Sequence, residues 1–280
     1  MTIRKAVITA AGPAHRSLPL QTLVDRDGTN RSCLELFVSE AIESGIQQVC
    51  IVVAPGDEPK YRAAAGSLAS RLSFVEQPSQ LGYGHAIHCA RDFVGNEPFL
   101  HMISDHLYLS RGDRRCARQL IEIAASENCS VSAVQATRES ALPYYGTIGG
   151  RRVHGQARLY EVETVIEKPT PTEAEQTLLV PGLRAGHYLC FFGMHVLTPA
   201  VMDTLGRLLS RPGEKPVTLS DAIAELCRRE RVLAHEIRGT RYNMGIKFGL
   251  LYAQLALALD GNDREEVLAH LVEAVAGRCR

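Results

Sequence analysis

The sequence alternates between short runs of apolar, β-forming residues and longer runs with helical spacing. Residues 5–10 (KAVITA) predict a buried strand, and residues 34–44 place apolar side chains at helical intervals. Gly45 ends that helix before a second apolar strand at residues 48–54. Such alternation favours crossover units, so we expect an α/β fold with a Rossmann-like mixed, mainly parallel sheet flanked by helices.

The same pattern continues to the end of the chain. It predicts further strands at residues 72–76, 99–103, 130–136, 147–149, 162–167, 186–194 and 232–237. It predicts further helices at residues 60–69, 84–93, 113–127, 199–210, 219–229, 247–259 and 263–277. Residues 11–32 form an irregular polar segment, and residues 170–185 are the best candidate for a mobile excursion.

No repeat, low-complexity tract or linker divides the chain. We therefore expect one domain over residues 1–260, followed by a C-terminal amphipathic helix within residues 261–280. The apolar residues of that helix, between Val267 and Val275, share one face. This face can pack within one subunit or between two, so a homo-oligomer is one expected arrangement.

Composition narrows the classes of partner. The chain has 280 residues, 45% of them apolar, which is enough to bury a full core. Its 31 basic and 31 acidic residues balance, so no general charge attracts nucleic acid or an anionic membrane. An anionic ligand would have to be held by local groups.

The eight cysteines, which include Cys279, show no CxxC pair and no zinc-like cluster. They predict free thiols in a reducing compartment. The apolar stretch near the N-terminus is too short for a signal peptide, and no segment approaches the ~18 apolar residues of a membrane span. A cytoplasmic location is therefore expected.

Two places carry candidate chemistry. The first strand opens into Ala11, Gly12 and Arg16, and a loop of small residues lets backbone amides approach a phosphate. Asp105 follows the apolar strand at residues 99–103, which puts a carboxylate where open α/β sheets bind ligands. An aspartate in this position can also simply cap a turn.

An ordered series of motifs spans nearly the whole chain. Its members are EQPSQLGYGHAIHCARDFVGNEPFLHMISDHL at 76–107, YYGTIGG at 144–150, VIEKPTP at 165–171, VTLSDAIAEL at 217–226 and GTRYNMGIKFGLLYAQLALAL at 239–259. The series resembles the bacterial UTP–glucose-1-phosphate uridylyltransferase family, within the sugar-1-phosphate nucleotidyltransferases.

The resemblance implies a nucleotide site. Ala10, Ala11 and Gly12 would line the nucleotide, while Gln77 and Gly82 would meet the edge and face of the uracil ring. An amide suits a pyrimidine edge, and glycine permits the close approach of a ring. The alternative is that Gln77 is an ordinary loop residue and Gly82 part of a turn.

The resemblance also implies a metal and a sugar site. Asp105 would hold Mg²⁺, a hard cation that prefers oxygen ligands. Glu167 would accept hydrogen bonds from sugar hydroxyls, Lys168 would meet the sugar phosphate, and Tyr145 and Gly146 would border the sugar. A solvated Glu-Lys pair and an ordinary Tyr-Gly turn are the alternatives.

Two departures from the family pattern bear on catalysis. The family loop has Gly-any-Gly-Thr-Arg and then a Pro-Lys pair, whereas residues 12–16 are Gly-Pro-Ala-His-Arg and no lysine lies between residues 5 and 60. Arg26 or Arg31 could compensate for the missing lysine. A second metal-binding aspartate of the family is replaced by Asn243, which offers a carbonyl oxygen but no full charge.

These observations leave three hypotheses. In the first, a sugar-1-phosphate attacks the α-phosphorus of a nucleoside triphosphate, which the resemblance implies is UTP, and releases pyrophosphate. Arg16 and a magnesium ion on Asp105 would stabilise the transition state, and Lys168 would position the attacking phosphate. In the second, the chain is a catalytically weakened pseudoenzyme that binds nucleotide sugars and regulates. In the third, it is a scaffold subunit that pairs through its last helix.

Overall fold

Strand β1 (Lys5–Thr9) lies within the main sheet of the computed structural model, which describes residues 1–211, 213 and 215–277. Its side chains alternate between two faces: Ala6 and Ile8 join one apolar core, and Val7 joins another. Because both faces are covered, the strand is almost continuously apolar. This explains why it is the clearest strand in the sequence.

The N-terminal half of the sheet is parallel. Its order is β5 (Leu72–Glu76), β4 (Gln48–Val53), β1 and β6 (Phe99–Ile103). The connections run through α1 (Cys33–Glu43), α2 (Glu58–Ala64), α3 (Tyr83–Cys89) and α4 (Arg91–Val94). The predicted bounds of β5 and β6 are confirmed.

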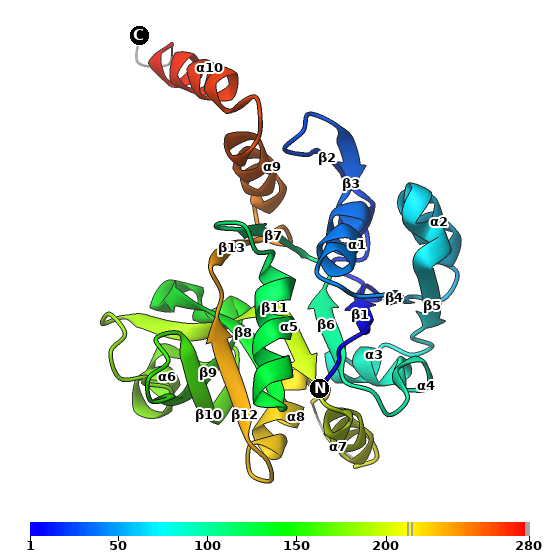
Figure 1. Ribbon diagram of the computed structural model, residues 1–280, viewed down its shortest axis with the longest axis vertical. Helices are drawn as coiled ribbons and strands as arrows, with labels where there is room; N and C mark the ends of the chain where they lie inside the picture. The colour runs from blue at the N-terminus through cyan, green and yellow to red at the C-terminus, as the bar shows by residue number, and fades with distance from the viewer. Residues whose placement is uncertain (212, 214, 278–280) are drawn as a thin grey trace.

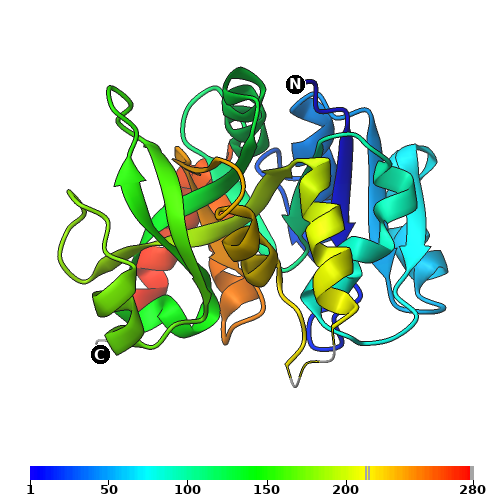
Figure 2. The same ribbon diagram turned by 90° about the horizontal axis from the view of Figure 1, so that it is seen from below.

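The C-terminal half is largely antiparallel. It contains β8 (Ser130–Arg138), β9 (Gly146–Arg152), β10 (Leu159–Glu167), β11 (His187–Leu197) and β12 (Val232–Glu236). Strand β11 pairs with β6 and so joins the two halves of the sheet. It also pairs with both β8 and β9, which lie at opposite ends of the order β8-β12-β10-β9, so these five strands form a closed ring. The mixed sheet is confirmed, but parallel pairing is confined to the first half and to β8 with β12. Figure 2 shows the two halves side by side, blue to cyan and green to orange.

Helices cover both faces of the sheet (Figures 1 and 2). Helices α1 and α5 (Cys116–Glu127) pack on the face that carries Ala6 and Ile8. Helices α3, α7 (Pro199–Leu209) and α8 (Leu219–Leu226) pack on the other face. Thr218 begins α8 with a capping box, in which its hydroxyl accepts from Asp221 N and Asp221 accepts from Thr218 N.

Three segments differ from the predictions. The segment predicted to be irregular contains a hairpin of β2 (Thr22–Val24) and β3 (Asn30–Ser32). Strands β7 (His106–Ser110) and β13 (Gly239–Asn243) form a second small sheet that was not predicted. The excursion expected at 170–185 contains helix α6 (Pro171–Thr177), because Thr170 and Glu173 form a capping box.

The C-terminal helices extend from the body of the protein, beside the β2–β3 hairpin (Figure 1). Helix α9 (Gly249–Asp260) packs against β13, and α10 (Arg264–Ala276) has no buried residue. The division at residue 260 stays a prediction, and Cys279 lies outside the described residues. None of the helices among the described residues combines the length and apolar composition needed to cross a membrane.

Two buried histidines face each other where the two halves of the sheet meet. His101 on β6 pairs in register with His195 on β11. The His195 ring bonds to Ser132 Oγ at 2.9 Å, and the His101 ring lies 3.3 Å from Thr9 Oγ1. Burial lowers the pKa of His195 to about 3 and lowers the pKa of His101 well below its usual value. Both rings are therefore neutral in the folded protein.

These histidines make stability depend on pH. Below pH 6.5 the unfolded chain binds protons that the folded protein does not, so the free energy of unfolding should fall as pH falls. Each histidine contributes a slope of up to about 1.4 kcal/mol per pH unit. Urea unfolding between pH 7.5 and pH 5 measures this slope. His195→Asn should flatten it, whereas the same change at the exposed His270 should not. A wild-type stability that is constant over this range would contradict the prediction.

Candidate active site

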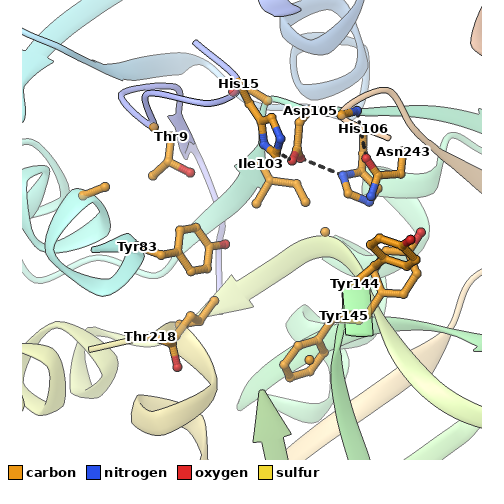
Figure 3. Close-up of a pocket in the computed structure, with 18 of the residues that line it drawn as sticks. Thr9, His15, Tyr83, Ile103, Asp105, His106, Tyr144, Tyr145, Thr218 and Asn243 are labelled. Carbon is orange, nitrogen blue, oxygen red and sulfur yellow. Dashed lines mark hydrogen bonds and ion pairs between the residues drawn. The ribbon is translucent and has the colours of Figure 1, made fainter. Parts of the chain in front are cut away.

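A cavity of about 820 Å³ opens at the carboxyl ends of the strands, where the two halves of the sheet meet. The loops after β1, β5, β6 and β10 line it, together with the start of α8 and the turn after β13. Figure 3 shows the side chains that project into it. The cavity therefore lies where open α/β sheets usually bind ligands.

Nearly all of the predicted site residues line this cavity. They are Ala10, Ala11, Gly12, Gln77, Gly82, Asp105, Tyr145, Gly146, Glu167, Lys168 and Asn243. Their individual roles stay predictions. Segments far apart in the sequence thus meet around one space, as the motif series led us to expect.

Arg16 is not among the lining residues. Its exposed guanidinium lies 3.6 Å from the carboxylate of Asp57. The loop turns tightly here: Arg16 N donates to Gly12 O, and Tyr61 donates from its hydroxyl to Arg16 O at 2.6 Å. This turn places the neighbouring His15, and not Arg16, at the cavity. The arginine of the loop therefore pairs with Asp57 and does not line the cavity, and its catalytic role stays a prediction.

Asp105 lies between two histidines (Figure 3). His15 Nδ1 is 3.0 Å from one carboxylate oxygen, and His106 Nδ1 is 2.7 Å from the other. Burial alone raises the pKa of Asp105, but the charge and hydrogen bonds of His106 and His15 outweigh it and leave this pKa well below its usual value. The hydrogen bond to Asp105 also raises the pKa of His15. The carboxylate is therefore ionised.

Asn243 lies beside this group. It ends β13, in register with His106 on β7, and Met244 N donates to Asp105 O at 2.8 Å. The Asn243 side-chain oxygen accepts from Gly245 N at 2.9 Å. The described residues hold no cluster of three or more His, Cys, Asp or Glu side chains arranged to bind a metal. Any cation here would need further ligands from a substrate or from water.

Glu167 and Ser220 form the opposite wall. Ser220 Oγ donates to Glu167 Oε2 at 2.5 Å, which fixes the carboxylate in the wall of the cavity. Gly146 makes this contact possible, since a Cβ there would lie 2.7 Å from Ser220 Oγ and 2.9 Å from Glu167 Oε2. Lys168 adopts a left-handed backbone with φ of 49°, and its N donates to Tyr145 O. A non-glycine residue in this conformation is uncommon and often marks a functional position.

Tyr145 is held by residues that the sequence reasoning did not single out. The buried Arg241 guanidinium lies 3.9 Å from the centre of its ring, and the His106 ring packs edge-on at 5.9 Å. Arg241 also donates to Thr137 Oγ1 at 2.9 Å. Cation–π stacking of this kind positions an aromatic wall. Arg241 lies in the motif GTRYN, which was the available signal.

The missing loop lysine is not replaced by the predicted arginines. Arg26 and Arg31 bind carboxylates on and beside the β2–β3 hairpin and do not line the cavity. Lys168 and Lys247 are the lysines that do so among the described residues. Lys247 follows Asn243 by four positions, in a motif the sequence analysis quoted without assigning it a role.

A family model described as nucleotidyl transferase matches residues 5–242 of the chain. A UTP–glucose-1-phosphate uridylyltransferase 1 of Streptococcus pyogenes serotype M3 is 29% identical, over 96% of this chain and 93% of the relative. A UTP–glucose-1-phosphate uridylyltransferase of Bacillus subtilis is 27% identical, over 98% of this chain and 96% of the relative.

Solved structures share the fold. A UDP-glucose pyrophosphorylase complexed with UDP-glucose superposes with a TM-score of 0.73 at 23% identity, covering 91% of this chain and 98% of that one. A UTP-bound enzyme of the same type from Acinetobacter baumannii also gives 0.73 at 23% identity, covering 97% and 99%. The overall fold of the chain is therefore that of these proteins.

The space beside Gly146 predicts a stability effect. Gly146→Ala would place a Cβ 2.6 Å from Phe191 and between Ser220 and Glu167, so it should destabilise the fold by about 1–3 kcal/mol. Gly12→Ala is the matched control, because a Cβ there meets nothing within 4 Å. Urea unfolding of both variants measures the difference. Equal stabilities would show that the wall at Gly146 is looser than the structure indicates.

Proposed function

Because the chain belongs to the nucleotidyl transferase family, we propose that it makes UDP-glucose and pyrophosphate from UTP and glucose-1-phosphate. The names of its relatives support this substrate pair. The observation that carries the proposal is that one cavity is lined both by Gln77 and Gly82, proposed for the nucleotide, and by Glu167 and Lys168, proposed for the sugar phosphate. Residues proposed to bind the two reactants thus line one cavity.

The reaction is an in-line displacement. A phosphate oxygen of glucose-1-phosphate forms a bond to the α-phosphorus of UTP, while the bond to the pyrophosphate oxygen breaks. Lys168 holds the attacking phosphate, and Glu167, fixed by Ser220, accepts hydrogen bonds from sugar hydroxyls. The backbone at residues 10–12 lies against the nucleotide. Positioning and charge supply the catalysis, so no covalent enzyme intermediate is needed.

The oxygen atoms of Asp105 and Asn243 suit a divalent cation such as Mg²⁺. An ionised carboxylate has lone pairs beyond those used by His15 and His106, and Asn243 adds an amide oxygen. Magnesium commonly binds one or two carboxylates together with substrate phosphates and water, and when bound it offsets phosphate charge. We propose Asp105 and Asn243 as its protein ligands.

Positive charge for the phosphates must come from the cavity itself. Lys168 and Lys247 line it, and His15 lies on Asp105. Arg16 lies outside and pairs with Asp57. We therefore propose that these lysines take the part which the family loop gives to its own lysine and arginine.

The remaining expectations, a cytoplasmic location and a homo-oligomer, stay predictions. The described cysteines are free thiols, which suits a reducing compartment.

Asp105 is the residue whose removal tests the activity. Asp105→Ala should lower the rate of pyrophosphate release from UTP and glucose-1-phosphate by on the order of 100- to 1000-fold, because it removes the ionised carboxylate of the cation site. Asp203→Ala is the matched control, a carboxylate that pairs with Arg91 on the surface. The assay should include other nucleoside triphosphates and sugar-1-phosphates. Undiminished activity of Asp105→Ala would refute the metal assignment, and no release with any pair would refute the enzymatic function.

The neutral Asn243 predicts weak metal binding that can be improved. Asn243→Asp adds a carboxylate beside Asp105, so the Mg²⁺ concentration for half-maximal activity should fall by on the order of tenfold. Titration of activity with Mg²⁺ measures this, with the exposed Asn262→Asp as control. An unchanged or higher Mg²⁺ requirement would indicate that residue 243 does not contact the metal.

A further inference from the structure

The side chain of Gln77 has a fixed orientation. It is 2% exposed, and its Nε2 lies 3.0 Å from Gly82 O and 3.1 Å from His85 Nδ1. A carbonyl oxygen can only accept, so the atom beside Gly82 O must be the amide nitrogen. Its two N–H groups then serve Gly82 and His85. This assignment follows from the partners themselves.

The carbonyl oxygen of Gln77 is the group left for a ligand. It has no hydrogen-bond partner in the part of the chain that the structure describes, and Gln77 lines the cavity. The oxygen is not among the buried side-chain atoms left without a partner, so it is open to the cavity, and a ligand that covers it must supply a donor. The cavity therefore presents an acceptor, and not a donor, at this point of the nucleotide side.

His85 must be an acceptor at Nδ1 to receive the second N–H. Its proton then lies on Nε2, which is 3.8 Å from Cys89 Sγ, one turn further along α3. Burial raises the pKa of the Cys89 thiol, so the sulfur stays neutral and can act as a weak acceptor. Cys89, His85 and Gln77 thus form a chain of contacts that ends at the cavity.

We propose that His85 is a positioning residue for base selection, which holds Gln77 so that only its carbonyl oxygen faces the nucleotide base. The inference rests on the proposed function and deepens it. Uracil and thymine carry a donor at N3 and satisfy this acceptor. Cytosine carries an acceptor at N3, so the two lone pairs would face each other. A site that leaves buried polar groups unpaired rejects such an analogue strongly.

Two substitutions separate the hydrogen bond of His85 from its bulk. His85→Phe keeps a ring but has no acceptor, whereas His85→Asn keeps an acceptor close to the position of Nδ1 and loses the ring. His88→Asn, on the same helix and outside the cavity lining, is the matched control. Calorimetry with UTP and with CTP measures base preference without requiring turnover.

The wild type should bind UTP more tightly than CTP. His85→Phe should reduce that ratio about tenfold, the usual value of one hydrogen bond, while His85→Asn and His88→Asn should retain it. With glucose-1-phosphate present, His85→Phe should raise KM for UTP and leave kcat nearly unchanged, since His85 does not touch the reacting phosphates.

Three results would overturn the inference: an unchanged ratio in His85→Phe, an equal loss in His85→Phe and His85→Asn, or a wild type without preference. The pyrophosphate assay on the wild type is the separate test of the proposed function. A wild type that releases pyrophosphate while His85→Phe keeps its base preference would remove the role of His85 and leave the activity standing. A wild type that binds UTP selectively but releases no pyrophosphate would refute the activity and leave the role of His85 standing.

Discussion

The pairing of β6 with β11 is the constraint on which the site depends. Strand β6 ends the parallel half of the sheet, and β11 begins the antiparallel half. Asp105 follows the carboxyl end of β6 closely. Strand β11 pairs with β9, which begins at Gly146, and β9 pairs with β10, which ends at Glu167. Where β11 leaves β6, its register with β8 shifts, and Gly193 takes a φ of +93°. The two halves diverge at this point, and the cavity occupies the space between them.

The two carboxylates of the cavity and the ring of Tyr145 are already held in place before a ligand arrives. Asp105 is bound by His15 and His106, and Glu167 is bound by Ser220. Tyr145 lies on Arg241. Side chains that are fixed in this way need little reorganisation when phosphate charge enters, which is how positioned dipoles and charges contribute most to catalysis.

Sequence patterns predicted what depends on local spacing. Buried strands such as β6 were located by their apolar runs, and Asp105 by its place directly after one. Strands β7 and β13 were missed because β7 begins only three residues after β6 and β13 is the polar run GTRYN. Neither has the signal of an independent strand, and each exists because it pairs with the other. Helix α6 was a different failure, since its capping box at Thr170 was present in the sequence.

Side-chain direction could not be obtained from the sequence. Arg16 matched the family loop and yet points to Asp57, because Tyr61, 45 positions along the chain, binds its carbonyl oxygen. The orientation of Gln77 depends on His85 and on the carbonyl of Gly82. Ser220 meets Glu167 across 53 positions. Such contacts are set by the closure of the fold, and no spacing rule describes them.

The two departures from the family pattern occupy one place in the structure. The His15 ring lies against Gly245, where a Cβ would be 2.8 Å from His15 Nε2. The same ring binds the carboxylate of Asp105, and the backbone carbonyl of Asp105 accepts a hydrogen bond from Met244 N, next to Asn243. Replacing a carboxylate by Asn243 removes a negative charge beside Asp105, and the imidazole at position 15 supplies a donor to the carboxylate that remains. The changes at 15 and 243 are thus neighbours that act on one group. Their effects should not be additive, because residues that share a partner couple.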